Sequence, residues 1–130
     1  MDKARLKDVP FFSSISKRDL AAVAQQTDEI DVPAGKVLAH EGDLGQEFFL
    51  IDSGVAEVTR GGERIAELHA GDFFGEMALL EEERRTATVT ATSPMSLMVM
   101  TRASFRALDR TMPQVHATVA KAITSRRQPA

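Results

Sequence analysis

Residues 47–72 read EFFLIDSGVAEVTRGGERIAELHAGD, a stretch in which short runs fit for β-strands alternate with turn residues. The strand-like runs are residues 47–52, 55–60 and 63–69. Between them lie Asp52-Ser53-Gly54 and Gly61-Gly62. Two adjacent glycines between strand-like runs are typical of a tight hairpin turn. The stretch therefore predicts consecutive antiparallel strands joined by short turns.

The same alternation of runs and turns extends in both directions, over residues 27–101. Further strand-like runs are residues 36–40, 86–92 and 95–101. They are bounded by turn signals such as Pro33-Ala34-Gly35 and Ser93-Pro94. Many short strands with Gly and Pro turns favour a β-sandwich or a barrel. We expect a β-roll over this region.

Helical patterns flank the predicted β-roll. Residues 1–26 read as helical, with Ser16 as a predicted N-cap. Residues 102–126 predict two further helices, the first capped by Thr101 and the second starting near Met112-Pro113. The second helix carries an apolar stripe at i, i+4, i+7 and i+8, namely Val115, Val119, Ala122 and Ile123. The predicted organisation is a single mainly β domain over residues 1–130.

Composition excludes several classes of function. The 16 Lys and Arg residues and 19 Asp and Glu residues give a net charge of −3, so we expect no nucleic-acid binding by this chain alone. No apolar run approaches the roughly 18 residues that a membrane span needs, and the charged start lacks the apolar core of a signal peptide. We therefore expect a cytoplasmic protein without a membrane partner. Cysteine is absent, which excludes disulfides and thiolate chemistry.

One segment, residues 74–89, does not fit a generic β-roll: it reads FGEMALLEEERRTATV. Its first half predicts a short helical turn opened by Gly75, and the small residues Gly75 and Ala78 leave backbone N–H groups accessible. Such a turn suits an anion, because its first N–H groups lack partners and carry partial positive charge. The forked guanidinium of Arg85 can hold a phosphate through two hydrogen bonds.

Two neighbouring side chains extend this chemistry. The hydroxyl of Thr86 can donate beside Arg85, and the carboxylate of Glu76 can accept from a hydroxyl pair or an amine. A ligand with a phosphate at one end and a ribose hydroxyl nearby satisfies all of these groups. Residues 81–84, EEER, are interpreted as an exposed charged loop. We also expect an unliganded Arg85 to be solvated.

The segments 74–80 and 85–89 together resemble the phosphate-binding cassette of the cyclic nucleotide-binding domain family. The resemblance covers about residues 5–126 and includes the strand–Gly–strand element 51–58 and the lead-in 70–73. It implies an eight-stranded jelly-roll barrel with an N-terminal helical segment and two C-terminal helices. It also implies that cAMP or cGMP binds between a cassette at residues 74–86 and the β-roll.

The resemblance also assigns roles to single residues. Glu76 would take the ribose 2′-hydroxyl, and Arg85 would pair with the cyclic phosphate. The backbone N–H groups of Gly75 and Ala78 and the hydroxyl of Thr86 would add hydrogen bonds, and Thr86 can also serve the 2-amino group of a guanine. Val58, Ala66 and Leu68 would wall the base. The predicted ligand-binding set is Phe74, Gly75, Glu76, Met77, Ala78, Arg85, Thr86, Val58 and Leu68.

Two classes of function remain open. The first is a non-enzymatic sensor of cAMP, with cGMP as a further ligand, whose C-terminal helices signal to a protein partner or a fused effector. The second is a module of the same fold for another effector or a protein, such as the truncated sensor part of a transcription regulator. A metal enzyme is disfavoured, because His40, His69 and His116 lack metal-ligand spacing. No cofactor is expected beyond the ligand.

Overall fold

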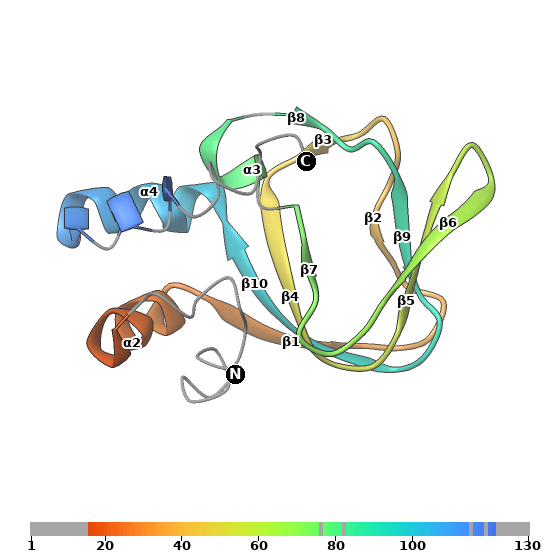
Figure 1. Cartoon of the computed structure of the whole chain (residues 1–130), viewed down its shortest axis with the longest axis horizontal. Coiled ribbons are helices and arrows are strands. Elements are labelled where there is room, and N and C mark those ends of the chain that lie inside the picture. Colours follow the sequence, from red (N-terminus) through yellow and green to blue (C-terminus); the bar gives the residue numbers. More distant parts are fainter. Residues whose placement is uncertain (1–15, 76, 82, 115, 119, 122–130) are drawn as a thin grey trace.

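The structure, a computed structural model, describes residues 16–75, 77–81, 83–114, 116–118 and 120–121. Two four-stranded antiparallel sheets form its centre (Figure 1). The first sheet has the order β1 (Asp28–Val32), β10 (Met95–Thr101), β4 (Glu47–Ser53) and β7 (Phe73–Phe74). The second has the order β2 (Val37–Ala39), β9 (Thr88–Ala91), β5 (Ala56–Arg60) and β6 (Glu63–Leu68). These eight strands confirm the predicted jelly roll.

A small additional pair, β3 (Leu44–Gly45) with β8 (Glu83–Arg84), lies outside the two main sheets. The predicted runs at 47–52, 55–60, 63–69 and 95–101 match strands closely, and the turn at Gly61-Gly62 joins β5 to β6 as expected. The run predicted at 86–92 forms a strand only from Thr88 to Ala91. Strands β1, β3, β7 and β8 were not predicted. Three of them are two residues long, and β1 is mostly acidic, so neither length nor composition marks them.

Strands β4 and β10 are buried on both faces, which explains their nearly continuous apolar sequences. On one face they contribute Phe48, Leu50, Met98 and Met100 to a core beneath the helices, here called the helix-side core. On the other they contribute Phe49, Ile51, Met95, Leu97 and Val99 to the core between the sheets, here called the inter-sheet core. Because successive side chains point to opposite faces of a strand, each strand serves both cores.

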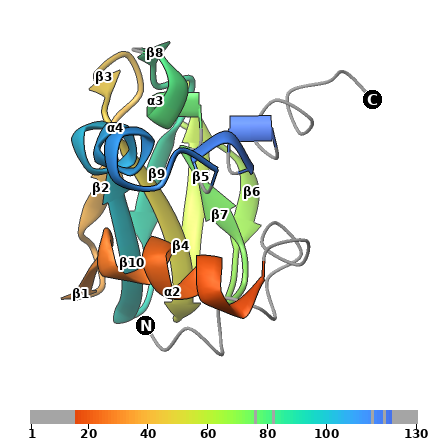
Figure 2. The same cartoon turned by 90° about the vertical axis from the view of Figure 1, so that its left-hand side faces the viewer.

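The helices α2 (Lys17–Gln25) and α4 (Arg102–Thr111) cover the outer face of the first sheet (Figure 2). Both predicted N-caps are confirmed: Asp19 N–H donates to Ser16 Oγ at 3.2 Å, and Ser104 N–H donates to Thr101 Oγ1 at 3.1 Å. After α4, the described residues 113–114, 116–118 and 120–121 are helical. Residues 1–15, Val115, Val119 and 122–130 lie outside the described residues. No helix in the described ranges is long and apolar enough to cross a membrane.

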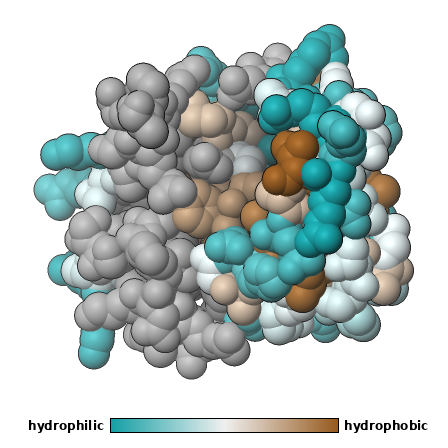
Figure 3. Space-filling view, turned by 45° about the vertical axis from the view of Figure 1, so that its right-hand side comes forward, coloured by the Kyte–Doolittle hydropathy of each residue, from teal (hydrophilic) through white to brown (hydrophobic). Residues whose placement is uncertain are grey.

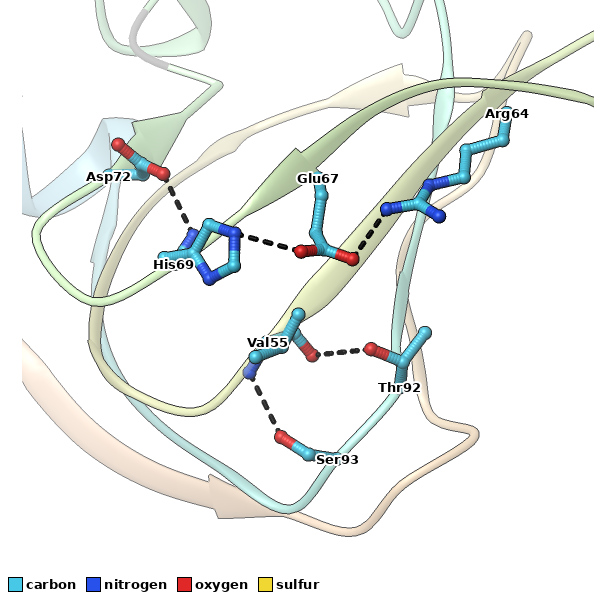
Figure 4. A network of polar contacts seen from close by, with 7 residues as sticks. All are labelled: Val55, Arg64, Glu67, His69, Asp72, Thr92 and Ser93. Carbon is cyan, nitrogen blue, oxygen red and sulfur yellow. Dashed lines mark hydrogen bonds and ion pairs between the residues drawn. The ribbon is translucent and has the colours of Figure 1, made fainter.

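The turn between β6 and β7 sets where the cassette begins. Gly71 N–H donates to Ile51 O at 2.8 Å, and Ile51 N–H donates to Asp72 O at 2.9 Å, which docks the turn on β4. Asp72 Oδ2 also accepts from His69 N–H at 2.8 Å, and His69 pairs with Glu67, which pairs with Arg64 (Figure 4). The chain therefore enters β7 and the cassette from a fixed position.

The burial of β4 predicts that truncating a leucine on this strand destabilises the fold far more than truncating a leucine on β3. Leu50 is fully buried in the helix-side core, whereas Leu44 on β3 is 50% exposed. Leu50→Ala should lower the free energy of unfolding by about 2–5 kcal/mol, because it removes buried methyl groups and leaves a cavity. The matched Leu44→Ala control should change it by less than about 0.5–1 kcal/mol in urea titrations. Equal losses in the two variants would contradict the assigned core.

Candidate functional site

A cavity of about 370 Å³ lies between the second sheet and the segment that follows β7. Figure 3 turns the side of the molecule that carries β6 toward the viewer and shows apolar surface within a hollow there. The cavity is bordered by the predicted residues Val58, Leu68, Phe74, Gly75, Met77, Ala78, Arg85 and Thr86. The ninth predicted residue, Glu76, lies outside the described residues.

The sequence-based assignment of the apolar wall needs one correction. Ala66 is exposed and does not border the cavity, whereas Ile65 does. The register shows why: Val58 pairs with Ala66 and Thr59 pairs with Arg64, so Ile65 is an unpaired bulge residue. A bulge re-aims a side chain relative to regular alternation, and the sequence carried no signal for it. Other lining residues that were not predicted are Ala39, Arg60, Arg84, Ala87 and Val89.

Arg85 is a cation of the cavity whose side chain packs closely against the backbone. Its guanidinium lies against two glycines: a Cβ on Gly45 would come within 2.5 Å of Arg85 Cζ, and one on Gly75 would clash with Arg85 Nη1. Gly75 also has φ +81°, a conformation that strains residues with a Cβ. Arg85 Nη2 donates to Glu47 O at 2.7 Å. These two glycines therefore shape a seat for the guanidinium.

The backbone of Arg85 is fixed as well. Arg85 N–H donates to Asp43 O at 2.8 Å, and Gly42 N–H donates to Arg85 O at 2.9 Å. The expectation that unliganded Arg85 is solvated holds only in part, because its side chain is half-buried and Nη2 donates to a backbone oxygen. The sequence did not reveal this because Gly45 and Glu47 lie about forty positions away along the chain.

The short helix α3 (Met77–Leu80) follows Gly75 and joins the cavity to the core. Ala78 N–H donates to Gly75 O at 3.0 Å, so this donor is already used within the turn, which differs from the expectation that it is accessible. Ala78 and Leu79 are buried, and Leu79 belongs to the helix-side core. On the preceding strand, Phe74 stacks on Phe49 with ring centroids 4.7 Å apart. The first half of the cassette is thus anchored at Phe74 and at α3.

Arg102, the first residue of α4, links the cassette to the C-terminal helix. Its Nε donates to Ala78 O at 2.8 Å, and its Nη2 donates to Gly45 O at 3.3 Å. Leu79 of α3 shares the helix-side core with Phe105 and Leu108 of α4. A displacement of α3 would therefore directly change its contacts with α4.

The arrangement suits a ligand with an anionic end and an apolar, flat end. Arg85 supplies the cation, and the second sheet supplies the apolar wall through Ala39, Val58, Ile65, Leu68 and Val89. The three histidines lie apart, with His69 beside Glu67 and His116 stacked on Phe105. Within the described ranges, no group of three His, Cys, Asp or Glu side chains could hold a metal ion.

Comparison with known proteins shows the family of this chain. Residues 29–111 match the sequence family described as the cyclic nucleotide-binding domain. Because the match spans more than half of the chain, this protein belongs to that family.

Similar proteins come from both eukaryotes and bacteria. A cAMP-dependent protein kinase regulatory subunit of Emericella nidulans is 37% identical over 110 residues, which cover 83% of this chain and 27% of that protein. A cyclic nucleotide-gated potassium channel of Rhizobium etli is 34% identical over 92% of this chain and 33% of its own length. The crystal structure of the Thermus thermophilus catabolite activator protein superposes with a TM-score of 0.76 at 32% identity, over 91% of this chain and 57% of that one. The chain thus spans about a quarter to a third of these two curated relatives.

The contacts of Arg85 predict a stability cost in the free protein. Arg85→Ala should lower the free energy of unfolding by about 0.5–1.5 kcal/mol, because it removes the hydrogen bond to Glu47 O. Arg106→Ala, at an exposed position of α4, is the matched control and should change stability by no more than about 0.5 kcal/mol. Both values follow from urea denaturation without nucleotide. Identical stability of the two variants would show that Arg85 is not held by the protein.

Proposed function

We propose that this domain is a sensor that binds cAMP, and also cGMP, in the cavity beside Arg85. The observation that carries the proposal is the seat of Arg85, whose guanidinium is already oriented at the cavity by Gly45, Gly75 and Glu47 O. A pre-oriented guanidinium loses little conformational freedom when it takes up a phosphate, which favours binding. Membership of the cyclic nucleotide-binding domain family supports the same ligand class.

In this proposal each part of the nucleotide lies beside protein groups that can bind it. The cyclic phosphate pairs with the guanidinium of Arg85, with the hydroxyl of Thr86 nearby. The purine packs against the apolar side chains of the second sheet, Val58 and Leu68 among them. Glu76 takes the ribose 2′-hydroxyl, a role that rests on its place in the cassette sequence.

The domain transmits binding through its C-terminal helix. Arg102 and Leu79 connect α3 to α4, so a ligand that favours one position of the cassette also favours one position of α4. A partner or a fused effector responds only if nucleotide affinity differs between the two positions. The relatives are a kinase regulatory subunit and a gated channel by name, which supports a regulatory rather than an enzymatic role. The cytoplasmic location remains a prediction.

Calorimetric titration tests the ligand class. The wild-type domain should bind cAMP and cGMP and discriminate against adenosine 5′-monophosphate. Arg85→Ala should weaken binding of both cyclic nucleotides by about 10- to 100-fold, because a charge-assisted contact to the phosphate is lost. Arg106→Ala should leave affinity unchanged. Wild-type affinity in Arg85→Ala would refute the phosphate site, and no binding to the wild-type domain would favour the alternative effector or interaction module.

A double-mutant cycle tests the role of Glu76. Glu76→Gln should weaken binding of cAMP but not of 2′-deoxy-cAMP, because removing the carboxylate and removing the 2′-hydroxyl delete the same hydrogen bond. Calorimetry of the wild type and Glu76→Gln with each of the two nucleotides gives the coupling free energy, which we expect to be about 1 kcal/mol or more. Additive losses would place Glu76 away from the ribose.

The link through Arg102 predicts a specific loss of communication. Hydrogen exchange of α4 should change when cAMP binds the wild-type domain. In Arg102→Ala this change should shrink while cAMP still binds, because the bonds to Ala78 O and Gly45 O are gone. Arg110→Ala, at an exposed position of the same helix, is the control. An undiminished change in Arg102→Ala would show that the signal takes another route.

A further inference from the structure

Besides Arg84 and Arg85, a third arginine borders the cavity, and it belongs to an otherwise apolar strand wall. Arg60 is the last residue of β5 and lines the cavity on the same strand as Val58. Positions two apart on a strand share a face, so Arg60 and Val58 project toward the same side. Around them this wall is formed by Ala39, Ile65, Leu68, Ala87 and Val89, which carry no polar side-chain atoms. In the proposed binding mode the purine packs against Val58 on this strand, so a cation two positions further along lies beside the purine rather than in the Arg85 seat.

The guanidinium of Arg60 has donors to spare. Its Nε donates to Thr86 O at 3.0 Å, which places the side chain across the cavity rim between β5 and the end of the cassette. Within the described part of the chain this is the hydrogen bond that the Arg60 side chain makes. The Nη1 and Nη2 groups form the opposite edge of the planar fork, and both can donate to a ligand.

We infer that Arg60 is a specificity-determining residue that reads the purine ring and favours guanine-type rings. The inference rests on the proposed function and names the base preference of that same site. The O6 and N7 atoms of guanine are adjacent acceptors that match the two Nη donors of an arginine. Adenine offers N7 but places an amino donor at the 6-position, which opposes a second donor. Arg60 therefore raises affinity for rings with a 6-oxo group relative to cAMP.

The Thr86 hydroxyl acts on a different part of the base, its 2-amino group. Cyclic inosine monophosphate separates the two effects, because it carries the 6-oxo group and N7 but no 2-amino group. If Arg60 reads O6 and N7, removal of Arg60 affects cGMP and cyclic inosine monophosphate alike. An effect of Thr86 on its 2-amino contact would appear with cGMP alone.

The test is calorimetric titration of cAMP, cGMP and cyclic inosine monophosphate into wild type, Arg60→Ala, Arg60→Lys and Arg64→Ala. Arg60→Ala should lose about fivefold in affinity for the two 6-oxo nucleotides and less than about twofold for cAMP, since one bidentate contact at an exposed rim is removed. Arg60→Lys keeps the charge without the fork and should lose nearly as much. Arg64→Ala removes the same charge from the same hairpin, where Arg64 pairs with Glu67 (Figure 4), and should change no affinity.

The titrations distinguish base reading by Arg60 from bracing of the cassette and from failure of the proposed function. An equal loss for all three nucleotides would show that Arg60 only braces the cassette through Thr86 O, and this would overturn the inference. Unchanged affinities in Arg60→Ala, or full retention in Arg60→Lys, would overturn it as well. If none of the three nucleotides bound the wild-type domain, the proposed function itself would fail.

Discussion

The contact between the Arg85 guanidinium and two glycines joins most of the site together. Gly45 comes from β3, Gly75 from the start of the cassette, and the carbonyl that accepts from Arg85 belongs to Glu47 at the start of β4. A side chain at either glycine would occupy the space of the guanidinium or its partner carbonyl. The charge that we propose for binding the phosphate is therefore positioned by backbone segments that are distant in sequence. This positioning depends on the jelly roll keeping those segments adjacent.

The two central strands provide that adjacency. Because β4 and β10 are buried on both faces, they join the helix-side core to the inter-sheet core. The cassette touches both: Phe74 packs with the inter-sheet core, and Leu79 packs in the helix-side core beside Phe105. A ligand at the cavity thus acts on a segment that is connected to the C-terminal helix. Signalling without catalysis needs only such a connection and a difference in affinity between two arrangements.

The sequence predicted the long strands, the hairpin, both helix caps and most of the cavity-lining residues. These features follow from local patterns: alternation of apolar residues, turn glycines, and capping side chains. It failed where the outcome depends on contacts between distant segments. The bulge that turns Ile65 toward the cavity, the cavity position of Arg60 and the partly buried seat of Arg85 have no local signature. The two-residue strands were missed because sheet pairing, not composition, defines them.

The most direct measurement of the central claim is a crystal structure of the domain with cAMP. We expect both exocyclic phosphate oxygens at about 3 Å from the Arg85 guanidinium, with that guanidinium still lying against Gly45 and Gly75. A phosphate bound elsewhere in the cavity, or an Arg85 side chain that leaves its two glycines to reach the nucleotide, would contradict it.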